Sequence, residues 1–171
     1  MSDKKIPITR VNKFFGAEDF NLQERMGMEW LHGWLNFTLV LYRVDREKTN
    51  TDDVYGEASP EEIRYFPPVE FKAYVQIAEP TNSSYASGLA RYNEPGNLIV
   101  NVYKKHLEEL DIDVRYGDYV GYPESEDKVN YYTVANDGKV TSDNAHTILG
   151  YKAFYRTIVC VPTQPNEFKG I

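Results

Sequence analysis

The sequence predicts a mainly β fold, a small β-barrel or sandwich with one short helix and an extended N-terminal arm. Residues Val69 to Ile77 alternate apolar and polar side chains with a strict period of two, which is typical of a half-buried strand. Aromatic residues make up 14% of the chain and include 14 tyrosines, and aromatic side chains favour strands. Turn signals rich in glycine, proline and asparagine separate several further strand-like segments, as in small barrels and sandwiches.

The remaining elements follow from local composition. Segments rich in β-branched and aromatic residues predict strands over 37–44, 119–122 and 129–134, and one or two more over 147–161. We expect the strand over 119–122 to begin after a turn at Gly117-Asp118 and to end at Pro123, and we expect a hairpin-type turn at Asn136-Asp137-Gly138. Residues 98–102 predict either a short strand or a segment that leads into a helix. That helix, of about two turns, has Tyr103, Leu107 and Leu110 on one face and Asn101 as a possible N-cap.

The chain of 171 residues fits one domain preceded by an arm. We divide it into an aromatic N-terminal arm, residues 1–36, and a β domain, residues 37–171. The arm is interrupted by glycines yet carries Phe14, Phe15, Trp30 and Trp34 as contact residues. Trp30 and Trp34 are four residues apart, so a short helix would place both on one face. The arm docks either on its own domain or on a neighbour, and the sequence leaves both alternatives open.

Residues 78–97 are rich in glycine, proline, serine and asparagine and predict a long loop. Loops of this length inside compact domains tend to be functional. The contact residues that this segment offers are Tyr85, Leu89, Arg91 and Tyr92. We therefore expect it to be a binding loop.

The charge and the cysteine content exclude several classes of protein. The net charge is −7 with a pI near 5.0, which argues against a protein that binds nucleic acid through lysine and arginine side chains. An acidic surface is nevertheless compatible with DNA that slides past without sticking. The single cysteine, Cys160, lies in an apolar run and predicts a small buried hydrophobe. The sequence shows no secretory signal and no apolar stretch of membrane-spanning length, so we expect a reducing cytosol.

No pattern in the sequence selects an active site. His32, His106 and His146 have no other histidine or cysteine at metal-ligand spacing, so we expect no zinc site. Asp111-Ile112-Asp113 lacks the glycine and the distal glutamate of an EF-hand loop. There is no phosphate-binding loop and no nucleophile elbow. We therefore expect no catalytic residue, no metal and no cofactor, and we interpret the chain as a part of an assembly.

Three segments resemble the neck (head-closure) proteins of contractile-tailed bacteriophages, of the T-even neck type. Asp52-Asp53-Val54-Tyr55-Gly56-Glu57 is similar to a D-x-x-[YF]-G-E element of that family. Gly117-Asp118-Tyr119-Val120-Gly121-Tyr122-Pro123 is similar to its G-D-x-x-x-[FY]-P element. Tyr131-Tyr132-Thr133-Val134, His146-Thr147-Ile148-Leu149-Gly150 and Phe154-Tyr155-Arg156 resemble its closing strands and turn. The order and rough spacing of these segments agree with the family over about residues 45–162.

The resemblance implies a structural virion protein that is assembled in the host cytoplasm and located in the neck. It implies a homo-oligomeric ring, expected to be a hexamer, between the portal-adaptor and tail-terminator proteins. Such a ring closes the DNA-filled head, docks the tail and leaves a channel through which DNA passes without specific binding. The implied interface or turn residues are Tyr55, Gly56, Glu57, Gly117 and Asp118. Of these, we expect the two glycines to hold backbone conformations that a Cβ would strain, and Asp118 to accept backbone hydrogen bonds.

Two alternatives to the neck ring stay open. The first is another virion ring, such as a tail terminator, or a part of the baseplate. The second is a small cytosolic module that binds a carbohydrate or a peptide, with residues 78–97 as its binding loop. Oligomeric size discriminates between the ring proteins and the module, because the module is expected to be a monomer.

Overall fold

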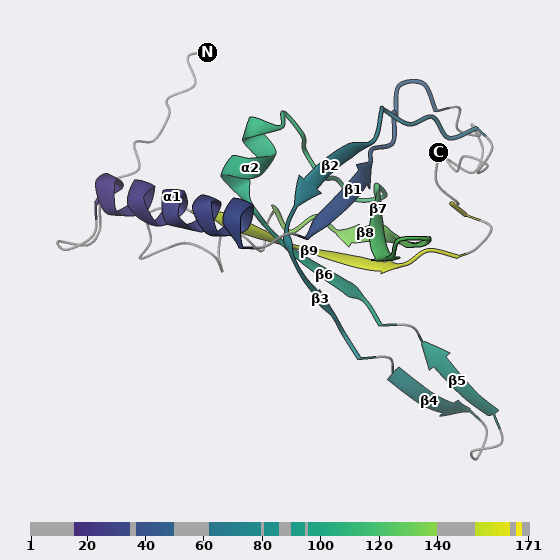
Figure 1. Ribbon diagram of the computed structural model, residues 1–171. Helices are drawn as coiled ribbons and strands as arrows, with labels where there is room; N and C mark the ends of the chain where they lie inside the picture. Colours follow the sequence, from purple (N-terminus) through teal and green to yellow (C-terminus); the bar gives the residue numbers. More distant parts are fainter. Residues whose placement is uncertain are drawn as a thin grey trace, which may run out of the picture.

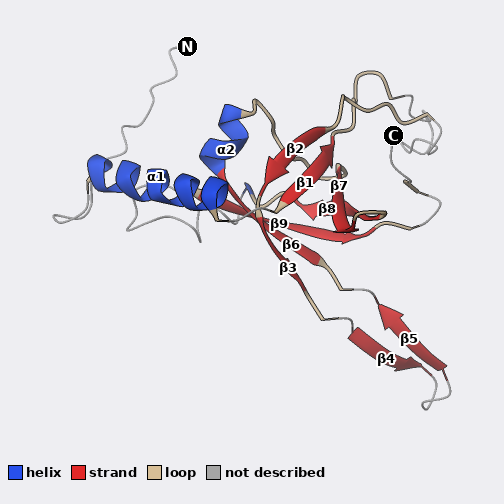
Figure 2. Ribbon diagram, in the orientation of Figure 1, coloured by secondary structure: helices blue, strands red, loops and turns tan. Residues whose placement is uncertain are grey.

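The structure is a computed structural model that describes residues 16–34, 37–49, 62–79, 81–85, 90–94, 96–139, 153–164 and 167–168, the ranges 81–85 and 90–94 by their backbone alone. Within these ranges the chain is mainly β, as the sequence predicts. Seven strands form one antiparallel sheet, two more form a projecting hairpin, and two helices lie beside the sheet (Figures 1 and 2).

The sheet consists of β1 (Thr38–Tyr42), β2 (Val69–Lys72), β3 (Tyr74–Ile77), β6 (Leu98–Tyr103), β7 (Tyr119–Ser125), β8 (Lys128–Asn136) and β9 (Tyr155–Pro162). Its strand order is β2-β1-β7-β8-β9-β6-β3. The prediction that a strand ends at Pro123 is wrong, because β7 continues to Ser125. The register shifts between Pro123 and Ser125, and such an irregularity accommodates a residue that has no N–H to donate.

The sheet curls back on itself because its two edge strands are halves of one segment. The strand predicted over Val69–Ile77 is divided at Ala73, with β2 pairing to β1 and β3 pairing to β6 at the other end of the order. Ala73 is fully buried, and its N–H donates to the carbonyl of Phe37. A small residue at this bend lets the backbone pass from one end of the sheet to the other. The two edge strands of the sheet therefore meet at Ala73, as is compatible with the predicted small barrel or sandwich.

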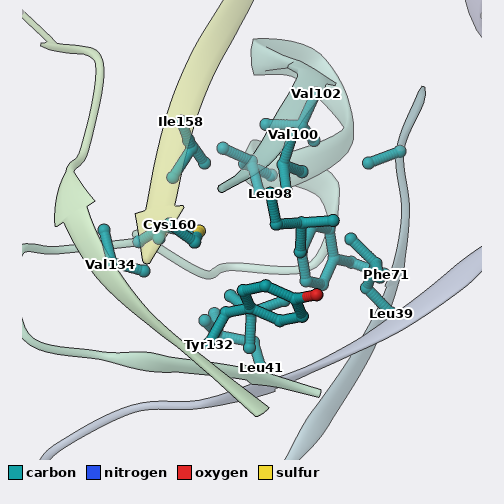
Figure 3. Packing of buried hydrophobic residues seen from close by; sticks show 14 of the residues in the cluster. Leu39, Leu41, Phe71, Leu98, Val100, Val102, Tyr132, Val134, Ile158 and Cys160 are labelled. Carbon is teal, nitrogen blue, oxygen red and sulfur yellow. The ribbon is translucent and has the colours of Figure 1, made fainter. Parts of the chain in front are cut away.

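The hydrophobic core lies inside this curled sheet (Figure 3). Burial alternates along β6, where Leu98, Val100 and Val102 are buried and the intervening side chains are partly exposed. Cys160 of β9 lies in the same core with no exposed surface, as predicted. Burial raises the pKa of its thiol to about 12, so Cys160 remains an uncharged thiol near neutral pH.

A short helix, α2 (Lys104–Glu109), follows directly on β6. Leu107 of α2, together with Ile112 and Val114 just after it, belongs to the core cluster. The helix is thus confirmed, but Asn101 as its N-cap is wrong. Asn101 lies within β6, where its Oδ1 accepts a hydrogen bond from Thr157 Oγ1 at 2.6 Å. The N-cap position belongs to Tyr103, which has an extended backbone and makes no side-chain capping bond.

The first helix, α1 (Ala17–Gly33), is much longer than the short helix predicted around the two tryptophans. Its first turn is stabilised by Asp19, whose Oδ2 accepts a hydrogen bond from the N–H of Gly16 at 2.7 Å. Phe20, Met28 and Leu31 are buried, so residues 17–33 pack on their own domain and are not an extended arm. Where α1 crosses β6, Gly27 faces the ring of Tyr103, which leaves no room for a Cβ without a shift of that ring.

Residues 78–97 are not the long loop that we predicted. β4 (Thr81–Tyr85) and β5 (Ala90–Glu94) pair antiparallel and form a hairpin that projects from the barrel beyond β3 and β6 (Figure 1). The hairpin continues the pairing of β3 with β6, because Ala78 N–H donates to the carbonyl of Asn97 at 2.9 Å between the two ladders. The composition, rich in serine and asparagine, did not indicate these two strands. They extend the ladder between β3 and β6, so they form without apolar alternation of their own.

An aromatic cluster at the C-terminal end of the described chain accounts for part of the tyrosine content. Phe168 is buried, and its ring packs against the rings of Tyr42, Tyr65, Tyr119 and Tyr131. The hydroxyl of Tyr119 donates to Glu167 Oε1 at 3.1 Å. These tyrosines therefore contribute to packing within the subunit, as expected for half-buried strand residues with a polar tip.

Candidate functional site

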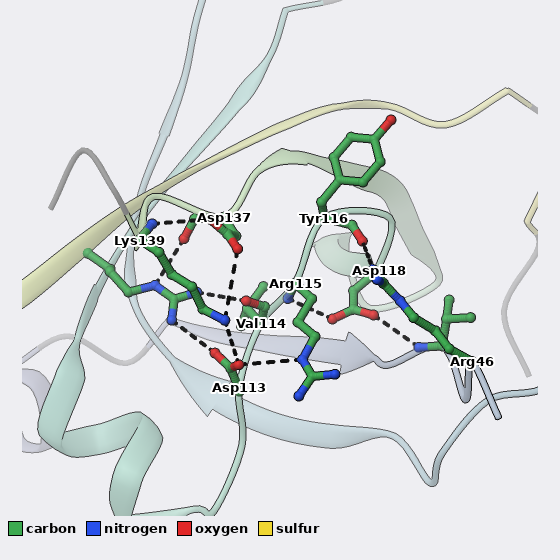
Figure 4. Close-up of polar contacts among 10 residues, drawn as sticks. Arg46, Asp113, Val114, Arg115, Tyr116, Asp118, Asp137 and Lys139 are labelled. Atoms are coloured by element: carbon green, nitrogen blue, oxygen red, sulfur yellow. Dashed lines mark hydrogen bonds and ion pairs between the residues drawn. The ribbon is translucent and has the colours of Figure 1, made fainter. Parts of the chain in front are cut away.

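The Gly117–Asp118 turn binds three parts of the chain together (Figure 4). Asp118 is only 2% exposed, and its carboxylate accepts hydrogen bonds from the N–H groups of Val44 at 3.0 Å and Arg115 at 2.8 Å. The backbone carbonyl of Asp118 accepts the N–H of Val134, and the N–H of Gly117 donates to the carbonyl of Val134. The side chain thus fixes the segment after β1, and the backbone fixes β8.

Gly117 has a φ of +85°, a conformation that side-chain-bearing residues rarely adopt. Burial raises the pKa of Asp118, and the backbone hydrogen bonds from Val44 and Arg115 act in the opposite direction. The turn has the backbone conformation and hydrogen bonds expected of it, and these partners lie in the same chain. Its geometry is therefore that of a structural turn, and a contact with another protein at this turn stays a prediction.

Only some of the other site residues predicted from the sequence lie within the described part of the chain. Tyr55, Gly56, Glu57, Leu89, Phe14 and Phe15 lie outside the described residues. Tyr85 ends β4, and Arg91 and Tyr92 lie in β5, so the structure brings these three together on one projecting hairpin. Trp30 and Trp34 lie at the C-terminal end of α1.

A second polar cluster surrounds the buried guanidinium of Arg156. It includes Asp113, Asp137 and Lys139, which Figure 4 labels. The three guanidinium nitrogens donate to the carbonyl of Asp137, to Asp113 Oδ1 at 3.1 Å and to the carbonyl of Val114 at 2.7 Å. Lys139 also binds Asp113, with an Nζ–Oδ2 distance of 2.7 Å. Burial opposes the charge on Asp113, but hydrogen bonds from Lys139 and Arg156 outweigh it and lower the pKa. Because each guanidinium nitrogen donates to a group of the same chain, the cluster contributes to the stability of the fold.

Sequence reasoning missed a group of two histidines and a glutamate between α1 and α2. The donor atoms of His32, His106 and Glu109 lie within 4.8 Å of one another. His106 is buried, and its Nε2 accepts the N–H of Lys72 at 3.0 Å. A neutral ring then carries its proton on Nδ1, which is buried without a hydrogen-bond partner among the described residues. Neither ring nitrogen offers a free lone pair, so this hydrogen bond opposes metal binding by His106. The spacing of His106 and Glu109 on one helix is visible in the sequence, but the approach of His32 is not.

The histidine group predicts a pH dependence of stability. Burial lowers the pKa of His106 below its ordinary 6.5, His32 and Lys72 add to this effect, and Glu109 opposes it. As the pH falls below about 6.5, the unfolded chain therefore takes up a proton before the folded chain does. We expect the free energy of unfolding to fall by at most about 1.4 kcal/mol per pH unit from this group.

The measurement is urea unfolding between pH 7.5 and 5.5, with His106→Gln as the matched variant. The glutamine can still accept the N–H of Lys72 but does not titrate, so the difference between wild type and variant isolates His106. Parallel pH profiles of the two proteins would contradict the assignment of a neutral buried histidine.

An exposed apolar stripe lies along α1. Leu22, Met26, Trp30 and Trp34 recur at intervals of four residues and are all exposed, Met26 by 60% and Trp34 by 85%. We call them the α1 stripe. Helical geometry places this stripe on a different face from the buried Phe20 and Leu31, so α1 has two apolar faces. Only Trp30 and Trp34 were predicted as contacts, although the four-residue spacing back to Leu22 was available in the sequence.

The α1 stripe leads into an open groove with a volume of about 340 Å³. We call it the aromatic groove, and its lining includes Trp30, Leu31, Tyr74, Tyr103, Phe154 and Tyr155. It lies where α1 meets β3, β6 and the start of β9. An exposed apolar stripe next to an apolar groove is typical of a protein–protein contact, because monomers rarely leave such a surface uncovered.

No helix in the described part of the chain combines the length and the apolar character needed to cross a membrane. Comparison with known proteins does not extend the resemblance found in the sequence. No protein-family model matches the chain, and no curated protein matches its sequence.

Proposed function

We propose that this chain is a structural virion protein that forms a homo-oligomeric ring, and that the ring belongs to the neck of a contractile-tailed phage. It closes the DNA-filled head, docks the tail and leaves a DNA channel. In this role it contacts portal-adaptor and tail-terminator proteins and has no catalytic residue. The observation that carries the assembly role is the α1 stripe with its adjoining groove.

The argument from the α1 stripe is energetic. Burying apolar surface contributes about 25 cal/mol per Å², and tryptophan and methionine are enriched in protein–protein interfaces. The stripe has two tryptophans and a methionine on one exposed face, although α1 already buries a separate face on its own domain. A surface of this kind is suited to a partner that covers it.

The shape of the subunit supports a ring. The β4–β5 hairpin projects away from the barrel in a direction different from α1 (Figure 1). Two unlike contact elements at separate places favour a head-to-tail contact, and such contacts form rings when the rotation between subunits closes. The net charge of −7 is compatible with a channel that does not retain DNA.

The assignment to the neck rests on the three sequence segments that resemble that family. Of these, the Gly117–Asp118 segment forms a fully hydrogen-bonded turn, while the segment at Asp52–Glu57 lies outside the described residues. The runner-up within the same class is another virion ring. A small binding module is the rival from another class, and the aromatic groove has a volume in the range of small-ligand pockets.

Oligomeric mass and head–tail joining test this proposal. Native mass spectrometry of the purified chain is expected to give a ring, with six times the subunit mass of 19.8 kDa as the specific expectation. Met26→Glu places a charge on the α1 stripe and is expected to reduce assembly and to leave filled heads and free tails in a complementation assay. Tyr116→Glu is the control, because Tyr116 is also exposed but lies outside the stripe.

The proposal would be contradicted, and the binding module favoured, if the purified chain were a monomer at micromolar concentration and heads and tails joined normally without this protein. Equal joining by the Met26 and Tyr116 variants would contradict the role of the stripe.

A further inference from the structure

A partner that is both apolar and basic would complement the aromatic groove and the α1 stripe. α1 carries the acidic residues Glu18, Asp19, Glu24 and Glu29 against one arginine, Arg25. With 100° per residue, Glu18 and Glu29 flank the α1 stripe on the side away from the buried face, and Arg25 lies beside them, so this border carries two negative charges and one positive charge. A partner that covers the stripe therefore meets a negative border, and electrostatic complementarity favours positive charge on that partner.

One segment of this chain has that chemistry. Residues 1–15, MSDKKIPITRVNKFF, contain four basic residues and one acidic residue, whereas the whole chain has a net charge of −7. The remainder of the chain therefore carries −10. The same fifteen residues contain six apolar side chains, which are Met1, Ile6, Ile8, Val11, Phe14 and Phe15. The only strongly basic stretch of the sequence is thus also rich in large apolar residues.

We infer that residues 1–15 of one copy dock on the α1 stripe and the aromatic groove of a neighbouring copy, with Phe14 and Phe15 as anchors in the groove. This rests on the homo-oligomer part of the proposed function and names the contact that joins its subunits. Large aromatic side chains that enter a pocket are the usual anchors of an interface. The phenylalanines are the largest apolar side chains of the segment, and the groove of about 340 Å³ has room for them.

Chain geometry requires that these anchors come from another copy. The α-helix rises 1.5 Å per residue, so Gly16 and Trp30 are separated by about 21 Å along α1. Phe14 is two residues before Gly16, and two extended residues span at most about 7 Å. The length of chain between Phe14 and Gly16 is therefore too short for Phe14 to enter, within one subunit, a groove at the other end of the helix. In a ring, residues 1–15 of each subunit reach the next subunit, and these contacts close the ring head to tail.

Photo-crosslinking of the full chain tests the inference. p-Benzoylphenylalanine is placed at position 14, and ¹⁵N-labelled and unlabelled chains are mixed and irradiated. Mass spectrometry is expected to find crosslinks from position 14 to peptides that contain Trp30, Tyr74 or Tyr155, with one labelled and one unlabelled partner. Tyr74→Arg removes a groove aromatic and adds a repulsive charge. We expect it to reduce this crosslink at least about fivefold, as loss of about 1 kcal/mol of binding requires. Tyr116→Arg, the matched control, is expected to leave the yield unchanged.

The outcomes separate this inference from the proposed function. Crosslinks from position 14 that join the groove within one copy, that lie elsewhere, or that are missing overturn the inference. If the chain nevertheless assembles at ring mass and joins heads to tails, the proposed function stands. If groove crosslinks between copies form in a chain that does not support head–tail joining, the inference stands and the neck assignment fails. Equal loss of crosslinking in the Tyr74 and Tyr116 variants would also overturn the role of the groove.

Discussion

Replacing Asp118 by alanine is expected to lower the free energy of unfolding by about 2–5 kcal/mol, because it leaves two buried backbone donors without a partner. The donors are the N–H groups of Val44 and Arg115, which bind the two carboxylate oxygens. Asp118→Asn is expected to lose less, since its amide oxygen keeps one acceptor while its NH₂ group faces the other N–H. Chemical denaturation of the full chain measures both effects.

The control for this experiment is Asp127→Ala. Asp127 is an exposed residue in the turn between β7 and β8, so its loss is expected to change stability by less than about 0.5 kcal/mol. If Asp118→Ala and Asp127→Ala were equally stable, the hydrogen-bonded turn would not be a main support of the fold. A loss of head–tail joining in an Asp118 variant is therefore to be compared with its stability before it is attributed to an interface.

Replacing Gly138 by alanine is expected to cost about 2–4 kcal/mol, from backbone strain and from overlap with a neighbouring strand. Gly138 has a φ of +71°, and an added Cβ would overlap the carbonyl oxygen of Thr157 in β9. The backbone cannot move away easily, because the N–H of Gly138 donates to Asn136 Oδ1 and the carbonyl of Asp137 accepts Arg156 Nε. Thermal or urea unfolding of the variant measures the loss.

Gly117→Ala separates the two contributions to this loss. Gly117 also has a positive φ, +85°, but apart from its chain neighbours no described residue has an atom within 4 Å of the position that its Cβ would take. This variant is expected to lose only the conformational term, about 1 kcal/mol. Similar losses at the two glycines would show that the contact with Thr157 relaxes at little cost.

Several features were determined by the sequence alone. The period-two alternation in Val69–Ile77 and the apolar run around Cys160 predicted strands and a buried thiol, because burial on one face of a sheet imposes that alternation locally. The helix before Leu110 was predicted for the same reason, from its 3.6-residue spacing. At the Gly117–Asp118 turn, a short polar side chain beside a glycine was sufficient to predict backbone hydrogen bonds.

Only the tertiary structure decided how these elements meet. The bend at Ala73, which sends one predicted strand to both ends of the sheet, depends on a hydrogen bond to Phe37 from a different part of the chain. The hairpin over 81–94 depends on the ladder that β3 and β6 begin, and its own composition resembles a loop. The approach of His32 to His106 and the contact of Gly138 with Thr157 likewise join residues distant in sequence. Periodicity reports which side of an element is apolar, but which partner covers that side depends on contacts between distant segments, and these are set by packing of the whole chain.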